Sequence, residues 1–284
     1  MKVGPGRRQH GLAALALSCV LASCGKSREI GPVSGPAASP TAPAEQAPTE
    51  HAPAPVVTAG AAVSPADGSP ADGSPAERKS DSAEPRRRYR VLALGDSITD
   101  QRVGGGGYLR ELGRACPKSR FDHFGRGGDM VSQMRRRLEQ GPPTPLANYD
   151  TLIVYGGVND LYSDLTAGRT NERIEQDLSA IYAAAKDRGL TVVAVTVSPW
   201  GGFSRYFNER RSRSTRLLNA WILGTAASGQ TDVVVDSYPL LSCGDPARLC
   251  PKYEAPSQDG LHPGPEGHAI LAQALLERAF SHCE

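Results

Sequence analysis

The chain has 284 residues, 22% of them charged, and a formal net charge of +2. This length fits one globular domain with extensions, and so small an excess of positive charge gives no indication of nucleic-acid binding. The N-terminus predicts a targeting segment, because Lys2, Arg7 and Arg8 precede an apolar run over residues 12–22. That run is shorter than the ~18 residues that a membrane span needs, so we expect a signal peptide over residues 1–23.

A cysteine closes the predicted signal in the sequence Leu21-Ala22-Ser23-Cys24, which resembles a bacterial lipobox. The resemblance implies cleavage before Cys24 and lipidation of its thiol, and plain secretory cleavage nearby is the alternative. Both alternatives predict an exported protein. The lipobox predicts, in addition, a membrane-anchored lipoprotein of the bacterial cell envelope.

The composition changes after the signal. Residues 25–88 are rich in Pro, Ala, Ser, Gly and Glu, and they contain neither leucine nor an aromatic residue. Such a segment buries too little apolar surface to offset an ordering entropy of ~1–2 kcal/mol per residue. We therefore predict a disordered tether over residues 24–88 and one folded domain over residues 89–284.

Apolar, β-branched runs alternate with amphipathic segments throughout this domain. The patterns predict strands at residues 91–94, 121–124, 151–155, 191–197 and 232–235. They predict helices at residues 108–115, 130–140, 171–188, 205–227 and 265–280. Strands that are short apolar runs separated by helices indicate an α/β domain with a parallel sheet covered on both faces.

Ser97 follows the first predicted strand in the sequence Gly95-Asp96-Ser97. Open α/β sheets hold their ligands at the carboxyl ends of strands, although these three residue types also favour ordinary turns. A nucleophilic serine needs a base and a group that orients the base. His262 and Asp259 fit these roles, because a carboxylate three residues before a histidine can hold its tautomer by a local hydrogen bond.

His268 lies near His262 in sequence but falls inside the last predicted helix, so we expect it to be a packed or surface histidine. A metal site formed by Asp259, His262 and His268 is the alternative. These residues show no recognised ligand spacing, and we predict no metal and no cofactor.

Two further loops offer hydrogen-bond donors for a developing oxyanion. One is Gly125-Arg126-Gly127-Gly128-Asp129 after the second strand, and the other is Gly157-Val158-Asn159-Asp160 after the third. Each loop taken singly fits a turn. Together with Ser97 they follow consecutive strands, whose carboxyl ends share one edge of a parallel sheet, so we expect all three groups to converge.

The four blocks Gly95-Asp96-Ser97, Gly127-Gly128-Asp129, Gly157-x-Asn159-Asp160 and Asp259-x-x-His262 resemble, in order and spacing, the SGNH hydrolases, also called GDSL esterases. The resemblance implies a flavodoxin-like, three-layer αβα fold with a five-stranded parallel sheet. It implies Ser97 as the nucleophile of an acyl-enzyme, His262 as its base and Asp259 as the orienting acid. The implied oxyanion donors are the N–H groups of Ser97 and Gly128 and the Asn159 side chain.

The resemblance predicts a serine esterase that hydrolyses carboxylic esters of an acetylated sugar, a lipid or a small alcohol. An acyltransferase with the same triad and a non-catalytic surface protein that binds carbohydrate or lipid are the alternatives. We expect a monomer that contacts the membrane only through its lipid and binds no nucleic acid. Trp200 and Phe203 follow the fourth strand and fit either a substrate pocket or the core.

Four of the six cysteines remain after the predicted processing: Cys116, Cys243, Cys250 and Cys283. An even number in an oxidising compartment predicts disulfides. Cys243 and Cys250 flank a Gly-Asp-Pro turn and should close a small loop. Cys116 and Cys283 follow the first and last predicted helices, which lie parallel on one face in a flavodoxin-like order, so we expect a second bridge there.

Overall fold

The computed structural model describes residues 85–284. The predicted signal peptide, the predicted lipidation site Cys24 and most of the predicted tether lie outside the described residues. Among residues 85–284, none of the helices is long and apolar enough to cross a membrane.

A five-stranded parallel sheet forms the centre of the domain, with the strand order β2-β1-β3-β4-β5. The strands are β1 (Arg90–Gly95), β2 (Arg120–Gly125), β3 (Thr151–Tyr155), β4 (Thr191–Val195) and β5 (Val233–Val235). This order is that of flavodoxin-like sheets, so the predicted fold class is confirmed.

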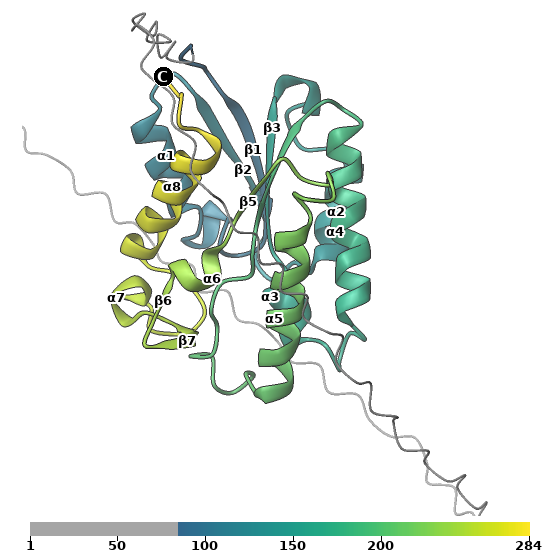
Figure 1. Cartoon of the computed structure of the whole chain (residues 1–284), viewed down its shortest axis with the longest axis vertical. Coiled ribbons are helices and arrows are strands. Elements are labelled where there is room, and N and C mark those ends of the chain that lie inside the picture. The colour runs from purple at the N-terminus through teal and green to yellow at the C-terminus, as the bar shows by residue number, and fades with distance from the viewer. Residues whose placement is uncertain (1–84) are drawn as a thin grey trace, which may run out of the picture. The chain divides into compact units, whose positions relative to one another are not determined.

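Helices cover both faces of the sheet (Figure 1). One face carries α1 (Gly107–Ala115) and α8 (Pro265–Ala279), and the other carries α2 (Val131–Gln140), α4 (Asn171–Lys186) and α5 (Glu209–Gly224). Shorter elements lie in the connections: η1 (Gln101–Val103), η2 (Leu146–Asn148), α3 (Val158–Tyr162), α6 (Ser237–Leu240), α7 (Pro251–Glu254) and an antiparallel hairpin of β6 (Ser242–Cys243) and β7 (Asp245–Leu249).

The side chains of β1 show how the two cores form. Val91 and Ala93 pack under α1 and α8, whereas Leu92 and Leu94 pack under the helices of the opposite face. All four are buried. Successive side chains of a strand point to opposite faces, so a continuous apolar run is what a strand covered on both faces requires.

Two predicted boundaries differ from the structure. α5 begins at Glu209 rather than near residue 205, because Asn208 caps it by accepting a hydrogen bond from the Arg211 N–H at 3.0 Å. β4 ends at Val195 rather than at Val197, because the Val197 N–H donates to the Asn219 side chain at 2.8 Å instead of to a neighbouring strand. α3, α6, α7 and the β6–β7 hairpin were not predicted; they are too short to show a period.

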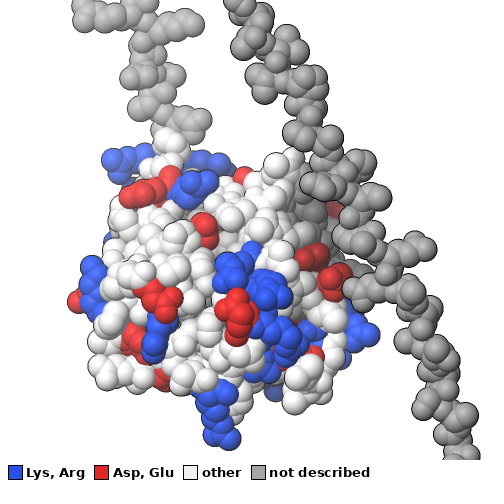
Figure 2. Space-filling model, turned by 60° about the horizontal axis from the view of Figure 1, so that its bottom comes forward, with Lys and Arg blue, Asp and Glu red and all other residues white. Residues whose placement is uncertain are grey.

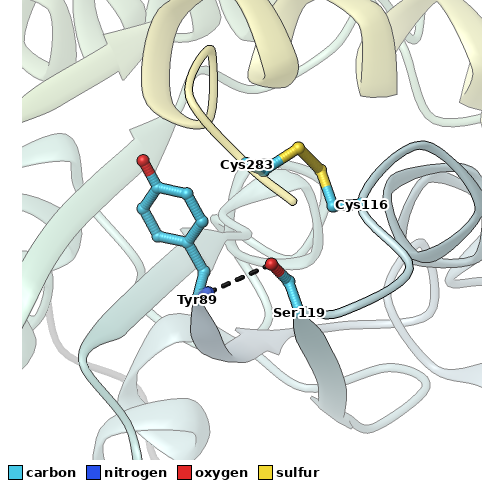
Figure 3. Close-up of a disulfide and its surroundings, with 4 residues drawn as sticks. All are labelled: Tyr89, Cys116, Ser119 and Cys283. Atoms are coloured by element: carbon cyan, nitrogen blue, oxygen red, sulfur yellow. Dashed lines mark hydrogen bonds between the residues drawn. A yellow bond between two sulfur atoms is a disulfide. The ribbon is translucent and has the colours of Figure 1, made fainter. Parts of the chain in front are cut away.

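Two disulfides join the cysteine pairs that the sequence predicted, Cys116–Cys283 and Cys243–Cys250. Figure 3 shows the first of them beside the start of β1, where the Tyr89 N–H donates to Ser119 Oγ at 3.0 Å. Arg87, which we assigned to the tether, pairs with Cys283 in an isolated bridge. Hydrogen bonding of the domain therefore begins two residues before the predicted boundary.

Candidate active site

Three side chains form a continuous chain of hydrogen bonds at the carboxyl edge of the sheet. Ser97 Oγ lies 2.8 Å from His262 Nε2, and His262 Nδ1 lies 2.6 Å from Asp259 Oδ2. An imidazole that donates from Nδ1 to a carboxylate presents an unprotonated Nε2 to the hydroxyl. The arrangement therefore allows His262 to remove the proton of Ser97.

The loop that carries His262 is fixed by bonds within itself. Asp259 Oδ1 accepts from the N–H groups of Leu261 at 2.9 Å and of His262 at 2.8 Å. Burial favours a raised pKa for Asp259, but these bonds and the His262 ring outweigh it and hold the pKa below its usual value. Asp259 is consequently ionised wherever His262 is needed as a base.

Ser97 stands on a tight turn at the end of β1. Asp96 Oδ1 accepts from the Ile98 N–H at 2.9 Å, and the Asp96 carbonyl accepts from the next two N–H groups along the chain. Gly95 is required here because a Cβ atom would lie 2.7 Å from the Tyr155 carbonyl of the neighbouring strand. The turn presents the Ser97 hydroxyl while the Asp96 side chain is buried beneath it.

The loop after β2 lies directly beside the nucleophile. A Cβ atom built on Gly127 would be 3.9 Å from Ser97 Cβ. The Gly127 N–H donates to Asp100 Oδ2 at 3.0 Å, whereas Gly128 has a φ of +79° and its N–H donates to no group among residues 85–284. Of these two glycines, only Gly128 has an N–H that is available as a donor among the described residues.

Asn159 brings the loop after β3 to the same place. Its side chain is buried at the start of α3, and its Nδ2 donates to the Asp129 carbonyl at 2.9 Å. That bond uses one amide hydrogen and leaves the other without a partner among the described residues. Asn159 is therefore tied to the Gly128–Asp129 loop while it keeps one donor for an oxyanion.

Asp100 is a site residue that the sequence analysis missed. Its carboxylate binds the Arg102 guanidinium at 2.9 Å as well as the Gly127 N–H. The Arg102 bond is the main reason that the pKa of Asp100 falls to about 2. Its position three residues after Ser97 was the only available signal, and no spacing rule assigns that position a role.

Arg137 of α2 and Asp160 of α3 support the loop that follows β2. Arg137 donates to the Gly95 carbonyl at 3.0 Å and forms an ion pair with Asp129 at 2.9 Å. Asp160 is buried and accepts from the Val131 N–H at 2.8 Å, at the start of α2. The predicted block Gly157-x-Asn159-Asp160 contained Asp160 without a function, and Arg137 lies in the helix predicted over residues 130–140, where no function was assigned to it.

A cavity of about 800 Å³ opens beside Ser97 and His262. Its walls include Gly104 and Gly105, which belong to four consecutive glycines at residues 104–107, and Pro256 and Pro263 of the His262 loop. Figure 2 views the end of the domain at which α7 and the β6–β7 hairpin lie; basic and acidic side chains alternate there with broad uncharged areas. The cavity has the size of many small-molecule sites.

His268 also lines this cavity, although it is almost completely buried in α8. Its ring stacks on Tyr108 with 6.0 Å between centroids. Burial, with the nearby Arg110 guanidinium, lowers the pKa of His268 to about 4, so the ring is neutral at pH 7. Within residues 85–284 no cluster of His, Cys, Asp and Glu side chains is arranged to hold a metal ion.

Trp200 belongs to the core rather than to the cavity beside Ser97. It is fully buried, donates from Nε1 to Thr215 Oγ1 at 3.0 Å, and packs edge-on against Phe207. Phe203 is half-buried and packs against Tyr206. Neither lines that cavity, so the core alternative holds for Trp200, and the pocket alternative is not supported for Phe203.

Comparisons with known proteins show a family and similar folds. Residues 93–270 match the sequence model of the GDSL-like lipase/acylhydrolase family. A GDSL-like lipase structure from Bacteroides thetaiotaomicron is 21% identical, with a TM-score of 0.55 over 66% of this chain and 86% of that one. The acetyl xylan esterase AlAXEase is 18% identical, with a TM-score of 0.52 over 66% and 98% of the two chains. A lipase/acylhydrolase from Enterococcus faecalis is 17% identical, with a TM-score of 0.52 over 66% and 94%. No match was found among curated proteins.

Proposed function

The chain belongs to the GDSL-like lipase/acylhydrolase family, and from that premise we propose that it is a serine esterase that forms an acyl-enzyme on Ser97. One observation carries the proposal: the Ser97–His262–Asp259 hydrogen-bond chain is complete, with bonds of 2.8 Å and 2.6 Å. A protein that only binds carbohydrate or lipid has no need for a nucleophile, a base and an orienting acid in this order.

Acylation begins when His262 Nε2 takes the Ser97 proton as Oγ attacks the ester carbonyl carbon. The carbonyl oxygen becomes an oxyanion, which the N–H groups of Ser97 and Gly128 and the Asn159 amide stabilise. His262 then gives its proton to the departing alcohol oxygen. The bond between carbon and alcohol breaks, and the acyl group stays on Ser97.

Deacylation repeats these steps with water as the nucleophile. His262 takes one proton from water, the resulting oxygen attacks the acyl carbon, and the proton returns to Ser97 Oγ as the acid leaves. Asp259 stays ionised throughout and stabilises the imidazolium that forms twice in each cycle. An alcohol in place of water gives acyl transfer by the same route.

We propose esters with a short acyl group and an alcohol as large as a sugar as the first substrates to test. The cavity of about 800 Å³ adjoins His262, the residue that must protonate the leaving alcohol. One similar structure is an acetyl xylan esterase. The acetyl xylan esterase supports an acetylated saccharide as the first ester to test, and the cavity is large enough to hold a sugar.

The test is labelling of the purified domain with a fluorophosphonate, followed by hydrolysis of acetyl, butyryl and decanoyl esters. We expect labelling at Ser97, its loss in Ser97→Ala, and the highest kcat/KM for acetyl esters. An unlabelled wild-type protein without activity on any ester contradicts the proposal. Preferential transfer to an added alcohol supports an acyltransferase instead.

We also propose that the protein is exported and anchored through a lipid on Cys24, on the lipobox resemblance and the composition of residues 25–88. The native protein should enter the detergent-rich phase in a Triton X-114 partition, and Cys24→Ala should move it to the aqueous phase. A wild-type protein found only in the aqueous phase contradicts the anchor.

A further inference from the structure

A second cavity, of about 380 Å³, lies beside the oxyanion loop and shares no lining residue with the cavity at His262. Gly127 and Gly128 form one wall, so the cavity begins next to Ser97. Arg126, Arg136 and Arg137 contribute the charged side chains of the other walls, together with Asp129. The proposed function uses the Gly128 N–H in this wall and none of the arginines.

The charges in this cavity do not balance. Arg137 is neutralised by its ion pair with Asp129 at 2.9 Å. Arg126 and Arg136 are exposed, and their side chains form no ion pair or hydrogen bond within residues 85–284. Two guanidinium groups are therefore left without acidic partners beside the proposed oxyanion hole.

The neighbourhood is electrostatically positive as well. The positive charges of Arg102 and Arg126 both disfavour the charged form of Arg137. Burial is the largest cause of the lowered pKa of Arg137, and these two cations add to it. Arg102 is already paired with Asp100 at 2.9 Å, so Arg126 and Arg136 remain the groups available to a ligand.

A polar amide adds a neutral donor to the same cavity. Gln133 lines it, and Gln133 Oε1 is occupied by the Met130 N–H at 2.8 Å. That bond fixes the orientation of the amide and leaves its NH₂ group as a donor. The cavity thus offers guanidinium and amide donors, and its one carboxylate, Asp129, is paired with Arg137.

We propose that this cavity binds an anionic group of the substrate, a carboxylate or a phosphate, through Arg126 and Arg136. A guanidinium presents a planar fork of N–H groups that matches the oxygens of either anion. The inference rests on the proposed esterase function and specifies it: the substrates are esters that carry a negative charge close to the scissile bond. Arg126 and Arg136 determine specificity and take no part in the chemical steps.

The charge can be carried by either part of the ester, and matched substrate pairs separate the two cases. For the acyl part, 4-nitrophenyl succinate is compared with 4-nitrophenyl butyrate. For the alcohol part, 4-acetoxybenzoate is compared with its methyl ester. Each pair gives a ratio of kcat/KM, anionic over neutral, for the wild type, Arg126→Gln, Arg136→Gln and the double variant.

We expect the ratio of at least one pair to fall about tenfold in the double variant at low salt, with kcat/KM for neutral esters within twofold of the wild type. About 0.5 M NaCl should remove most of this difference by screening. Arg213→Gln is the matched control, because Arg213 is another exposed arginine on a helix and does not line either cavity. It should leave every ratio unchanged.

A binding measurement keeps this inference separate from the esterase proposal. With Ser97→Ala, calorimetry should show binding of glucuronate or glucose 1-phosphate, weaker or absent binding of glucose, and loss of the difference in the Arg126→Gln, Arg136→Gln background. If the wild-type protein hydrolyses no ester, the esterase proposal is contradicted, and the binding measurement still tests the anion site. Unchanged hydrolysis ratios together with unchanged anion binding in the double variant overturn the anion site.

Discussion

The two halves of the site around Ser97 are built in different ways. On the base side, Asp259 holds His262 through bonds that span two or three residues of one loop. On the oxyanion side, the bonds join segments about 30 residues apart: Asp100 to Gly127, Asn159 to Asp129, and Asp160 to Val131. The base is thus oriented by its own loop, whereas the oxyanion hole exists only when three strands and two helices are in place.

This difference predicts which substitutions lower only the reaction rate and which also lower the stability of the fold. A change on the base side should affect chemistry with little effect on folding, because Asp259 and His262 are partly exposed and bonded locally. A change on the oxyanion side removes buried partners and should affect both kcat and stability. The predictions below test this contrast, in order of decreasing expected effect.

The largest effect is expected from the triad itself. Ser97→Ala and His262→Ala should each lower kcat by ~10⁴-fold or more, and the double variant should be scarcely worse than either, because the members of a triad act as a unit. The melting temperature should change little. Steady-state kinetics and thermal unfolding measure both quantities. Additive losses in the double variant are incompatible with a shared function of Ser97 and His262.

Asn159→Ala should rank second. It takes one donor from the developing oxyanion, so kcat should fall by ~10²–10³-fold while KM changes little. It also leaves the buried Asp129 carbonyl without its partner, so urea unfolding should show a loss of about 1–3 kcal/mol. A loss of kcat with unchanged stability would contradict the expectation that changes on the oxyanion side affect both quantities.

Asp100→Asn should have a smaller effect on activity, because Asp100 acts only through the loop that carries Gly128. Weakening its bond to the Gly127 N–H should lower kcat by about tenfold, with KM unchanged, by an amount typical of a lost charge-assisted bond. Asp164→Asn is the control, since Asp164 pairs with Arg210 and Arg211 away from both cavities. It should reduce stability and leave kcat unchanged; equal kcat losses in both variants would refute the positioning role of Asp100.

The smallest net change is expected in the pH dependence of wild-type stability, because two buried groups oppose each other. Burial raises the pKa of Asp96 to about 7 from 3.8, so its contribution to stability is full below pH 4 and is lost as the pH rises to 7. Burial lowers the pKa of His268 to about 4 from 6.5, so its contribution is present above pH 6.5 and is lost as the pH falls to 4. The two changes are of similar size, on the order of 3 kcal/mol, and offset each other.

Single substitutions should reveal these opposing slopes. In Asp96→Asn the free energy of unfolding should fall as the pH is lowered from 6.5 to 4, because only His268 remains. In His268→Gln it should fall as the pH is raised from 4 to 7. Urea unfolding at intervals of half a pH unit measures both slopes. Variants whose curves run parallel to that of the wild type would show that neither buried group titrates as described.

Elements with a strong local pattern can be predicted from the sequence alone. The apolar strands β1, β3, β4 and β5 and the long helices follow from periodicity, and the Asp259–His262 pair follows from a spacing that one loop can satisfy. The small-loop disulfide follows from Cys243 and Cys250 around a turn. Each of these depends on residues that are close in the chain, where spacing alone fixes what can meet.

The contacts on the oxyanion side, and the charges around it, depend on tertiary packing. Asp100 reaches Gly127, and Arg137 reaches the Gly95 carbonyl, because parallel pairing brings the ends of β1 and β2 together. The same pairing directs the Gly127 N–H to Asp100, leaves the Gly128 N–H without a partner among residues 85–284, and places Arg126 and Arg136 around one cavity. Side chains about 30 residues apart show no period and no fixed spacing, so their meeting depends on the packing of the whole sheet.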